Sequence, residues 1–126
     1  MKKIVLALVA CSALTFASDT TIDATMKLMK QGMDQIQMGF MYNSKDDIKR
    51  GIETVGNSDA IFKHVKVSDF MKSNKTTVAN NINSNLTQDL KSLKKAVNGG
   101  KYSEATKQYG KVLNDCLSCH TIIRGW

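Results

Sequence analysis

The sequence predicts an all-α protein, an antiparallel four-helix bundle, on three observations. Apolar residues recur every three or four positions in four segments, as in helices that bury one face. Short polar stretches join the segments, and short connections join antiparallel neighbours in helical bundles. The 126 residues include no Pro, the residue that interrupts helices most strongly. This length fits a single domain.

The N-terminal segment, residues 1–17, has the organisation of a signal peptide. Lys2 and Lys3 precede an apolar run, and Thr15-Phe16-Ala17 supplies small residues at the −3 and −1 positions of a cleavage site. We therefore expect an exported, periplasmic protein whose mature domain spans 18–126. In an alternative route, Leu8-Val9-Ala10-Cys11 resembles a bacterial lipoprotein signal, and lipid on Cys11 would anchor the protein to a membrane. Apolar residues follow Cys11 where a polar tether is expected, which favours the first route.

The first helix of the mature domain is expected over about 20–41, and the second segment over about 45–64. Ser44, with an acidic residue three positions later, predicts the start of the second segment. Gly56-Asn57-Ser58 interrupts its apolar face, so we expect a broken or kinked helix, followed by an irregular linker to residue 73. The apolar face of the first helix consists of Ile22, Met26, Met29, Met33, Ile36 and Phe40.

The third and fourth helices are expected over about 75–97 and 103–125. Asn98-Gly99-Gly100 marks the stop and turn between them. The third helix has a stripe of Val78, Ile82, Leu86, Leu90, Leu93 and Val97, and the fourth a stripe of Ala105, Tyr109, Val112, Cys116, Cys119 and Ile123.

The fourth helix contains Cys116-Leu117-Ser118-Cys119-His120, the C-x-x-C-H pattern of c-type haem attachment. Positions i, i+3 and i+4 share one face of a helix, so both thiols can bond to one haem while the imidazole of His120 reaches its iron. Two other interpretations of the motif, a redox dithiol and a zinc site, fit the residues less well. A redox dithiol does not need the adjacent His, and a zinc site needs a second pair of ligands that His64, the other His, does not supply.

With this motif in the last helix, the chain resembles the class II c-type cytochromes, the group of cytochrome c′ and its low-spin relatives. Arg124, four residues after the His, matches the family pattern, whereas Ile123 stands where an aromatic is usual. Lys27-Leu28-Met29-Lys30 is similar to the segment that supplies the distal Met of low-spin members. The resemblance implies a four-helix bundle with one covalently attached haem c, and an electron-transfer function.

His120 is the expected proximal ligand of the iron, and the sixth position decides the function. A thioether ligand would make an electron carrier. Met29 is the expected distal ligand, with Met33 or Met26 as alternatives. An open distal side would instead give a five-coordinate protein that binds nitric oxide or carbon monoxide, as in cytochrome c′. His64 is expected on the surface.

The charge of the chain bears on its partners. The mature chain carries a formal charge of +5, that is, the +7 of the whole chain less Lys2 and Lys3. Such a surface aids solubility and can also steer acidic redox partner proteins. Export and the lack of interleaved basic and aromatic residues argue against nucleic acid. We expect no enzymatic activity, since the sequence has no distal His and Arg pair suited to a peroxidase. The family resemblance also implies that the protein could form a homodimer.

Overall fold

The computed structural model describes residues 2–71 and 73–124, with side chains from Thr20 onward except those of Ser73 and Arg124. It consists of α1 (Lys2–Met41), α2 (Lys45–Phe62), the short 3₁₀ helix η1 (Val67–Asp69), α3 (Ser73–Asn98) and α4 (Tyr102–Arg124). No strand occurs within these ranges, so the prediction of an all-helical fold is confirmed. The side chains on which the signal-peptide and lipoprotein predictions depend, those of residues 1–17 including Cys11, lie outside the described part, as does the side chain of Arg124.

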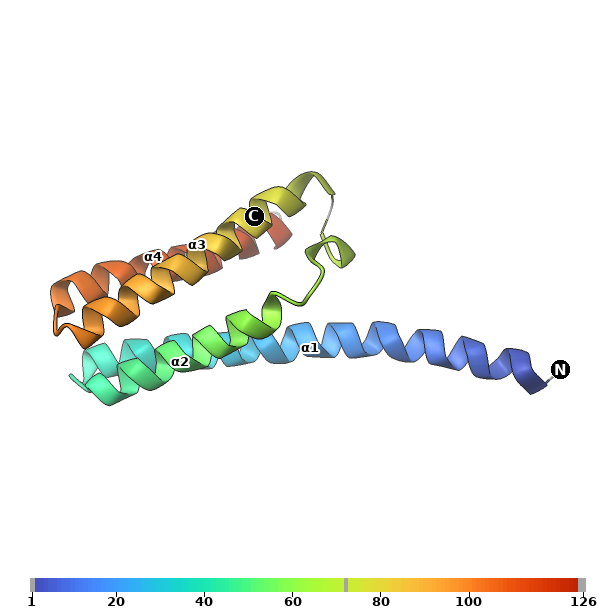
Figure 1. Ribbon diagram of the computed structural model, residues 1–126, viewed down its shortest axis with the longest axis horizontal. Helices are drawn as coiled ribbons and strands as arrows, with labels where there is room; N and C mark the ends of the chain where they lie inside the picture. Colours follow the sequence, from blue (N-terminus) through green and yellow to red (C-terminus); the bar gives the residue numbers. More distant parts are fainter. Residues whose placement is uncertain (1, 72, 125–126) are drawn as a thin grey trace.

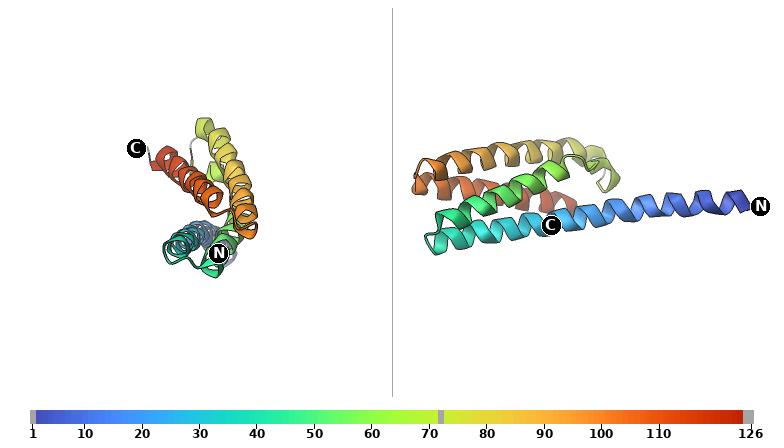
Figure 2. Two further views of the ribbon diagram at one scale, coloured as in Figure 1. Left: turned by 90° about the vertical axis from the view of Figure 1, so that its left-hand side faces the viewer. Right: turned by 60° about the horizontal axis from the view of Figure 1, so that its bottom comes forward.

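The helices form two pairs that lie side by side (Figure 1). The turn from α1 to α2 and the turn from α3 to α4 lie at the same end of the molecule, and Figure 2 shows this from two further directions. α1 runs towards that end and α4 starts from it. The N-terminal half of α1 extends far beyond the end of α2 (Figure 1).

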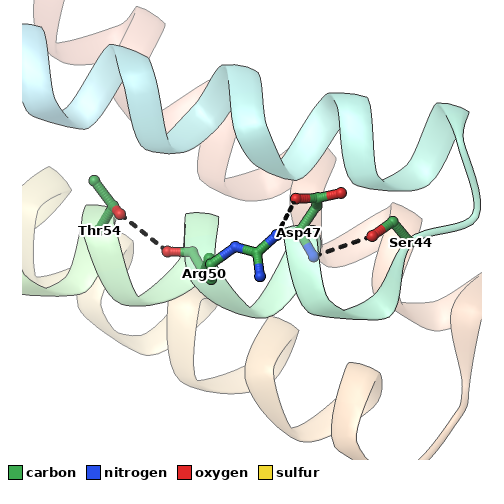
Figure 3. Close-up of polar contacts among 4 residues, drawn as sticks. All are labelled: Ser44, Asp47, Arg50 and Thr54. Atoms are coloured by element: carbon green, nitrogen blue, oxygen red, sulfur yellow. Dashed lines mark hydrogen bonds and ion pairs between the residues drawn. The ribbon is translucent and has the colours of Figure 1, made fainter.

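The start of α2 is built as the sequence predicts. The Ser44 hydroxyl accepts a hydrogen bond from the backbone N–H of Asp47 at 3.3 Å, which satisfies one free donor of the first turn. Arg50 Nη2 lies 2.6 Å from Asp47 Oδ1, and the Thr54 hydroxyl donates to the Arg50 carbonyl at 3.0 Å (Figure 3). The hydrogen bond from Ser44 and the ion pair with Arg50 lower the pKa of Asp47 below its usual value.

The expected break in the second helix was wrong, because α2 continues without interruption from Lys45 to Phe62. Gly56 costs a helix only about 1 kcal/mol relative to Ala. Val55 before it and Phe62 after it are both buried, and their burial outweighs that cost. The hydroxyl of the buried Ser58 is satisfied within the helix, since it donates to the Thr54 carbonyl at 2.8 Å.

The core lies where all four helices meet. Residues from every predicted stripe are buried in it, which supports the periodicity argument helix by helix. The turn at Gly99-Gly100 is also confirmed: Gly100 has a φ of +68°, and the backbone N–H of Gly99 bonds to the Lys95 carbonyl at 3.0 Å. The buried core cluster consists of Met33, Ile36, Ile48, Ile52, Val55, Leu86, Leu90, Leu93, Ala96, Val97, Ala105 and Val112.

Candidate functional site

The C-x-x-C-H motif lies in the last third of α4. Cys116 is half-buried and packs against the core cluster, Cys119 is also half-buried, and His120 is exposed. On an uninterrupted helix, residues three and four apart are neighbours, so the two thiols and the imidazole share one face of α4. This placement offers two attachment points near the core and one nitrogen ligand further out.

Burial changes the acid–base chemistry of the two thiols. It raises the pKa of Cys116 to about 11, with further contributions from the carboxylates of Asp115 and the thiol of Cys119. Burial also raises the pKa of Cys119. Redox-active C-x-x-C pairs depend on a thiol whose pKa is lowered, because the thiolate is the nucleophile. The environment of these cysteines is therefore opposite to that of a redox dithiol.

A metal site made only of side chains requires several ligands close together. Within the described residues, no group of three His, Cys, Asp or Glu side chains is arranged to hold a metal ion. A structural zinc site needs four such ligands. A covalently attached haem would make a smaller demand, because the thiols would bond to porphyrin carbons and only His120 of this helix would bind the iron.

Several apolar side chains near the motif are exposed to solvent. Leu113 and Leu117 are four residues apart on α4 and are both exposed, as is Ile123 at the end of the helix. Val78, at the level where α3 begins, is 48% exposed although it belongs to the predicted core stripe. Exposed apolar surface of this kind is typical of ligand or partner sites. Two thiols, an imidazole and exposed apolar surface are the features that a covalently attached haem would require of the chain.

The Met residues of α1 differ in their surroundings. Met33 belongs to the core cluster between the four helices. Met29, one turn earlier, is 7% exposed but stands outside that cluster, and Met26 is half-buried. Lys27 and Lys30 beside Met29 lie on the exposed side of α1 and pair with Asp23 and Asp34 at 2.7 and 2.5 Å.

Two buried carboxyl groups were missed by the sequence argument. Asp59 on α2 accepts a hydrogen bond from Thr87 at 2.8 Å and pairs with Lys63 at 3.3 Å, while its second oxygen has no partner within the described residues. Asp115 on α4 is 8% exposed and also has one unpartnered buried oxygen. The sequence could have predicted the burial of Asp59, because this residue lies four positions after Val55 and therefore on the buried face of α2.

The end of α4 is tied to the start of α3. Lys75 Nζ donates to the backbone carbonyl of Ile122 at 3.1 Å, only two residues after His120. A cation at the C-terminal end of a helix is stabilised by the helix dipole and satisfies a carbonyl that has no partner within the helix. His64 is exposed, as expected, two residues beyond the end of α2.

Comparison with family models, curated proteins and solved structures found no match to this chain. Among the helices of the described residues, none has both the length and the apolar character that a membrane span requires. The resemblance to class II cytochromes therefore stands on the residues of the chain itself.

Proposed function

We propose that this protein is a periplasmic monohaem c-type cytochrome that carries single electrons within an antiparallel four-helix bundle. The observation that carries the proposal is the position of Cys116, Cys119 and His120 on one face of the last helix, beside exposed apolar residues. Both thiols are half-buried, which favours attachment of a group that itself packs against the core.

A ring contact supports Met29 as the sixth ligand. The rings of Phe40 on α1 and Tyr109 on α4 lie 5.9 Å apart between centroids. His120 lies eleven positions after Tyr109, and Phe40 lies eleven positions after Met29. Helices rise by the same 1.5 Å per residue. With α1 and α4 antiparallel, Met29 would thus stand level with His120, whereas Met33 would stand level with Cys116.

Haem, when bound, supplies an iron that accepts and releases one electron. The residues of this chain would hold the haem and keep water away from it. Cys116 and Cys119 would hold the porphyrin, and His120 and Met29 would hold the iron in both oxidation states, so that electron transfer would require little movement of the chain. Buried Met33 and the neighbouring core residues exclude water from one side. An electron carrier of this kind acts on no substrate, so no group on the chain would need to transfer a proton to one.

The test is the absorption spectrum of the purified ferric and ferrous protein, with and without carbon monoxide. We expect six-coordinate low-spin iron in both states and no rapid binding of carbon monoxide. A high-spin ferrous spectrum that changes at once with carbon monoxide would contradict the electron-carrier hypothesis and support the gas-binding alternative. A purified protein without haem would overturn both.

The location follows from the signal peptide proposed for residues 1–17, and periplasmic fractionation tests it. Redox partner proteins with acidic surfaces suit the net charge of +5 of the mature chain. Faster electron transfer at low ionic strength than at high ionic strength is the expected sign of such steering.

A further inference from the structure

Basic residues are distributed unevenly between the two pairs of helices. Residues 18–62, with α2 and the part of α1 after the proposed signal peptide, carry five basic and seven acidic residues. Residues 73–124, with α3 and α4, carry eight basic and three acidic residues. Six Lys but only one acidic residue, Glu104, lie in residues 91–111, around the turn from α3 to α4. The positive charge of the mature chain is therefore concentrated near this turn.

The Lys side chains near the α3–α4 turn are available to a partner. The ion pairs in the described part of the chain all join side chains of α1, of α2 or of Lys63. The six Lys residues of 91–111 are exposed and take part in none of these pairs. Lys27 and Lys30 on α1, by contrast, are each paired with a carboxylate one turn away. The charge around the α3–α4 turn is thus free to attract anions.

Exposed aromatic and apolar side chains occur at the same end of the molecule. The α1–α2 turn and the α3–α4 turn lie together there (Figures 1 and 2), and we call this end the closed end. Met41 is 76% exposed and Tyr42 is 74% exposed in the first turn, which is followed by the exposed Lys45. Tyr102, directly after Lys101 in the second turn, is 39% exposed. Tyr has an apolar body and a polar hydroxyl, and it is enriched at the headgroup level of membranes.

A hollow between the two turns adds a place for a lipid headgroup. It measures about 290 Å³ and is lined by residues of both turns, among them Asn43, Lys45 and Ser103. The amide, ammonium and hydroxyl groups of these side chains are hydrogen-bond donors, and phosphate oxygens are acceptors. Phe40 and Ile48 also line the hollow, so donors and apolar groups occur together, as at the boundary of a bilayer.

We propose that the closed end of the bundle docks this protein on the surface of an anionic lipid bilayer. Lys45, Lys95 and Lys101 face the headgroup phosphates, and Met41 and Tyr42 enter the interface. Side chains as exposed as these two fit readily into a fluid headgroup layer, whereas an acidic protein would need a pocket shaped for them. Such docking requires no lipid on Cys11.

Docking by the closed end leaves the C-x-x-C-H motif away from the membrane. His120 lies 18 positions after Tyr102 on α4, about 27 Å along the helix axis. This distance exceeds the Debye length of about 8 Å at physiological ionic strength, so the charge of the bilayer acts weakly at the motif. If the proposed function is correct, a haem on this motif remains open to redox partners while the protein is docked.

The experiment is co-sedimentation of the purified protein with lipid vesicles. We expect binding to vesicles of equal parts phosphatidylglycerol and phosphatidylcholine, release by added salt, and no binding to phosphatidylcholine alone. Lys95→Gln combined with Lys101→Gln should weaken binding by about fivefold for each Lys. Lys27→Gln combined with Lys30→Gln removes the same charge from α1. This control should change binding little, because Lys30 lies 12 positions, about 18 Å of helix, before Tyr42.

Tyr42→Ala tests the contribution of the exposed ring. It should weaken binding to the anionic vesicles severalfold, whereas Leu28→Ala, which shortens another exposed side chain of α1, should not. Equal losses in the two double Lys variants would show that net charge alone drives binding and would overturn the inference. No binding to anionic vesicles would also overturn it and would assign the lysines to an acidic protein partner. The assay does not depend on haem, so either result leaves the electron carrier to its own spectral test.

Discussion

Gly32 on α1 and Gly51 on α2 bring the backbones of their helices into contact. A Cβ atom on Gly51 would lie 2.6 Å from the carbonyl oxygen of Gly32 and 2.7 Å from the backbone nitrogen of Ile36. A Cβ on Gly32 would in turn lie 2.9 Å from the Gly51 carbonyl oxygen. Only glycine fits at both positions, so the pair determines how closely the first two helices pack.

We expect Gly51→Ala to lower the free energy of unfolding by about 1–3 kcal/mol, because the added methyl group meets backbone that cannot yield. The measurement is urea unfolding followed by circular dichroism. Gly56→Ala is the matched control on the same helix, where no atom lies within 4 Å of the added Cβ. It should raise the free energy of unfolding by about 0.5–1 kcal/mol through the helix preference of Ala. Equal effects of the two variants would contradict the close contact.

Substitution of the proposed distal ligand tests the register of α1 against α4. Met29→Ala should turn the iron high-spin and lower the midpoint potential by about 0.1 V or more, a part of the roughly 0.8 V range that axial ligands span. Absorption spectra and a redox titration check this. Met33→Ala removes a buried residue of similar exposure from the core cluster and should destabilise the protein without changing the spin state. If only the Met33→Ala variant became high-spin, Met33 would be the distal ligand and Met29 a packing residue.

The two thiols of the motif can be separated from the third cysteine of the chain. In Cys116→Ser combined with Cys119→Ser, we expect no haem to remain on the denatured chain, because no thioether can form. Staining of denaturing gels for haem measures this. Cys11→Ser should keep one haem per chain, since that residue precedes the proposed cleavage site. Haem retained on the denatured double variant would show that the motif is not its attachment point.

The pH dependence of stability follows from Asp115. Its pKa is about 6 in the folded protein, against an ordinary value of 3.8. The folded state thus binds more protons between these values, so the contribution of Asp115 to the free energy of unfolding is largest below about pH 3.8 and is lost as the pH rises through about 6.

Asp115→Asn should remove this loss and stabilise the protein at pH 8 by about 1 kcal/mol, less than a full two-unit shift because the charge of Asp89, the second cause of the raised pKa after burial, is partly exposed. Urea unfolding at pH 5 and pH 8 measures the difference, with the exposed Asp46→Asn as the control. A variant that is less stable than the parent at pH 8 would contradict the raised pKa of Asp115.

Local patterns in the sequence were sufficient for the helices and their ends. Apolar spacing predicted the buried residues of α3 from Leu86 to Val97, and Ser44 predicted the start of α2. The same reasoning failed at Gly56, because a local interruption says nothing about the burial of Val55 and Phe62 on either side. It also placed Val78 in the core, although this residue is half-exposed near the end of the bundle where the motif lies.

By itself, the sequence determined the elements of this protein and its central motif. Helical spacing and turn residues are local properties, and two cysteines and a histidine at i, i+3 and i+4 share a face on any helix. Only the tertiary structure decided which residues from distant segments meet: Gly32 with Gly51, Asp59 with Thr87, and Phe40 with Tyr109. Those contacts depend on the packing of whole helices, in which many weak apolar contacts outweigh any preference that a single residue expresses.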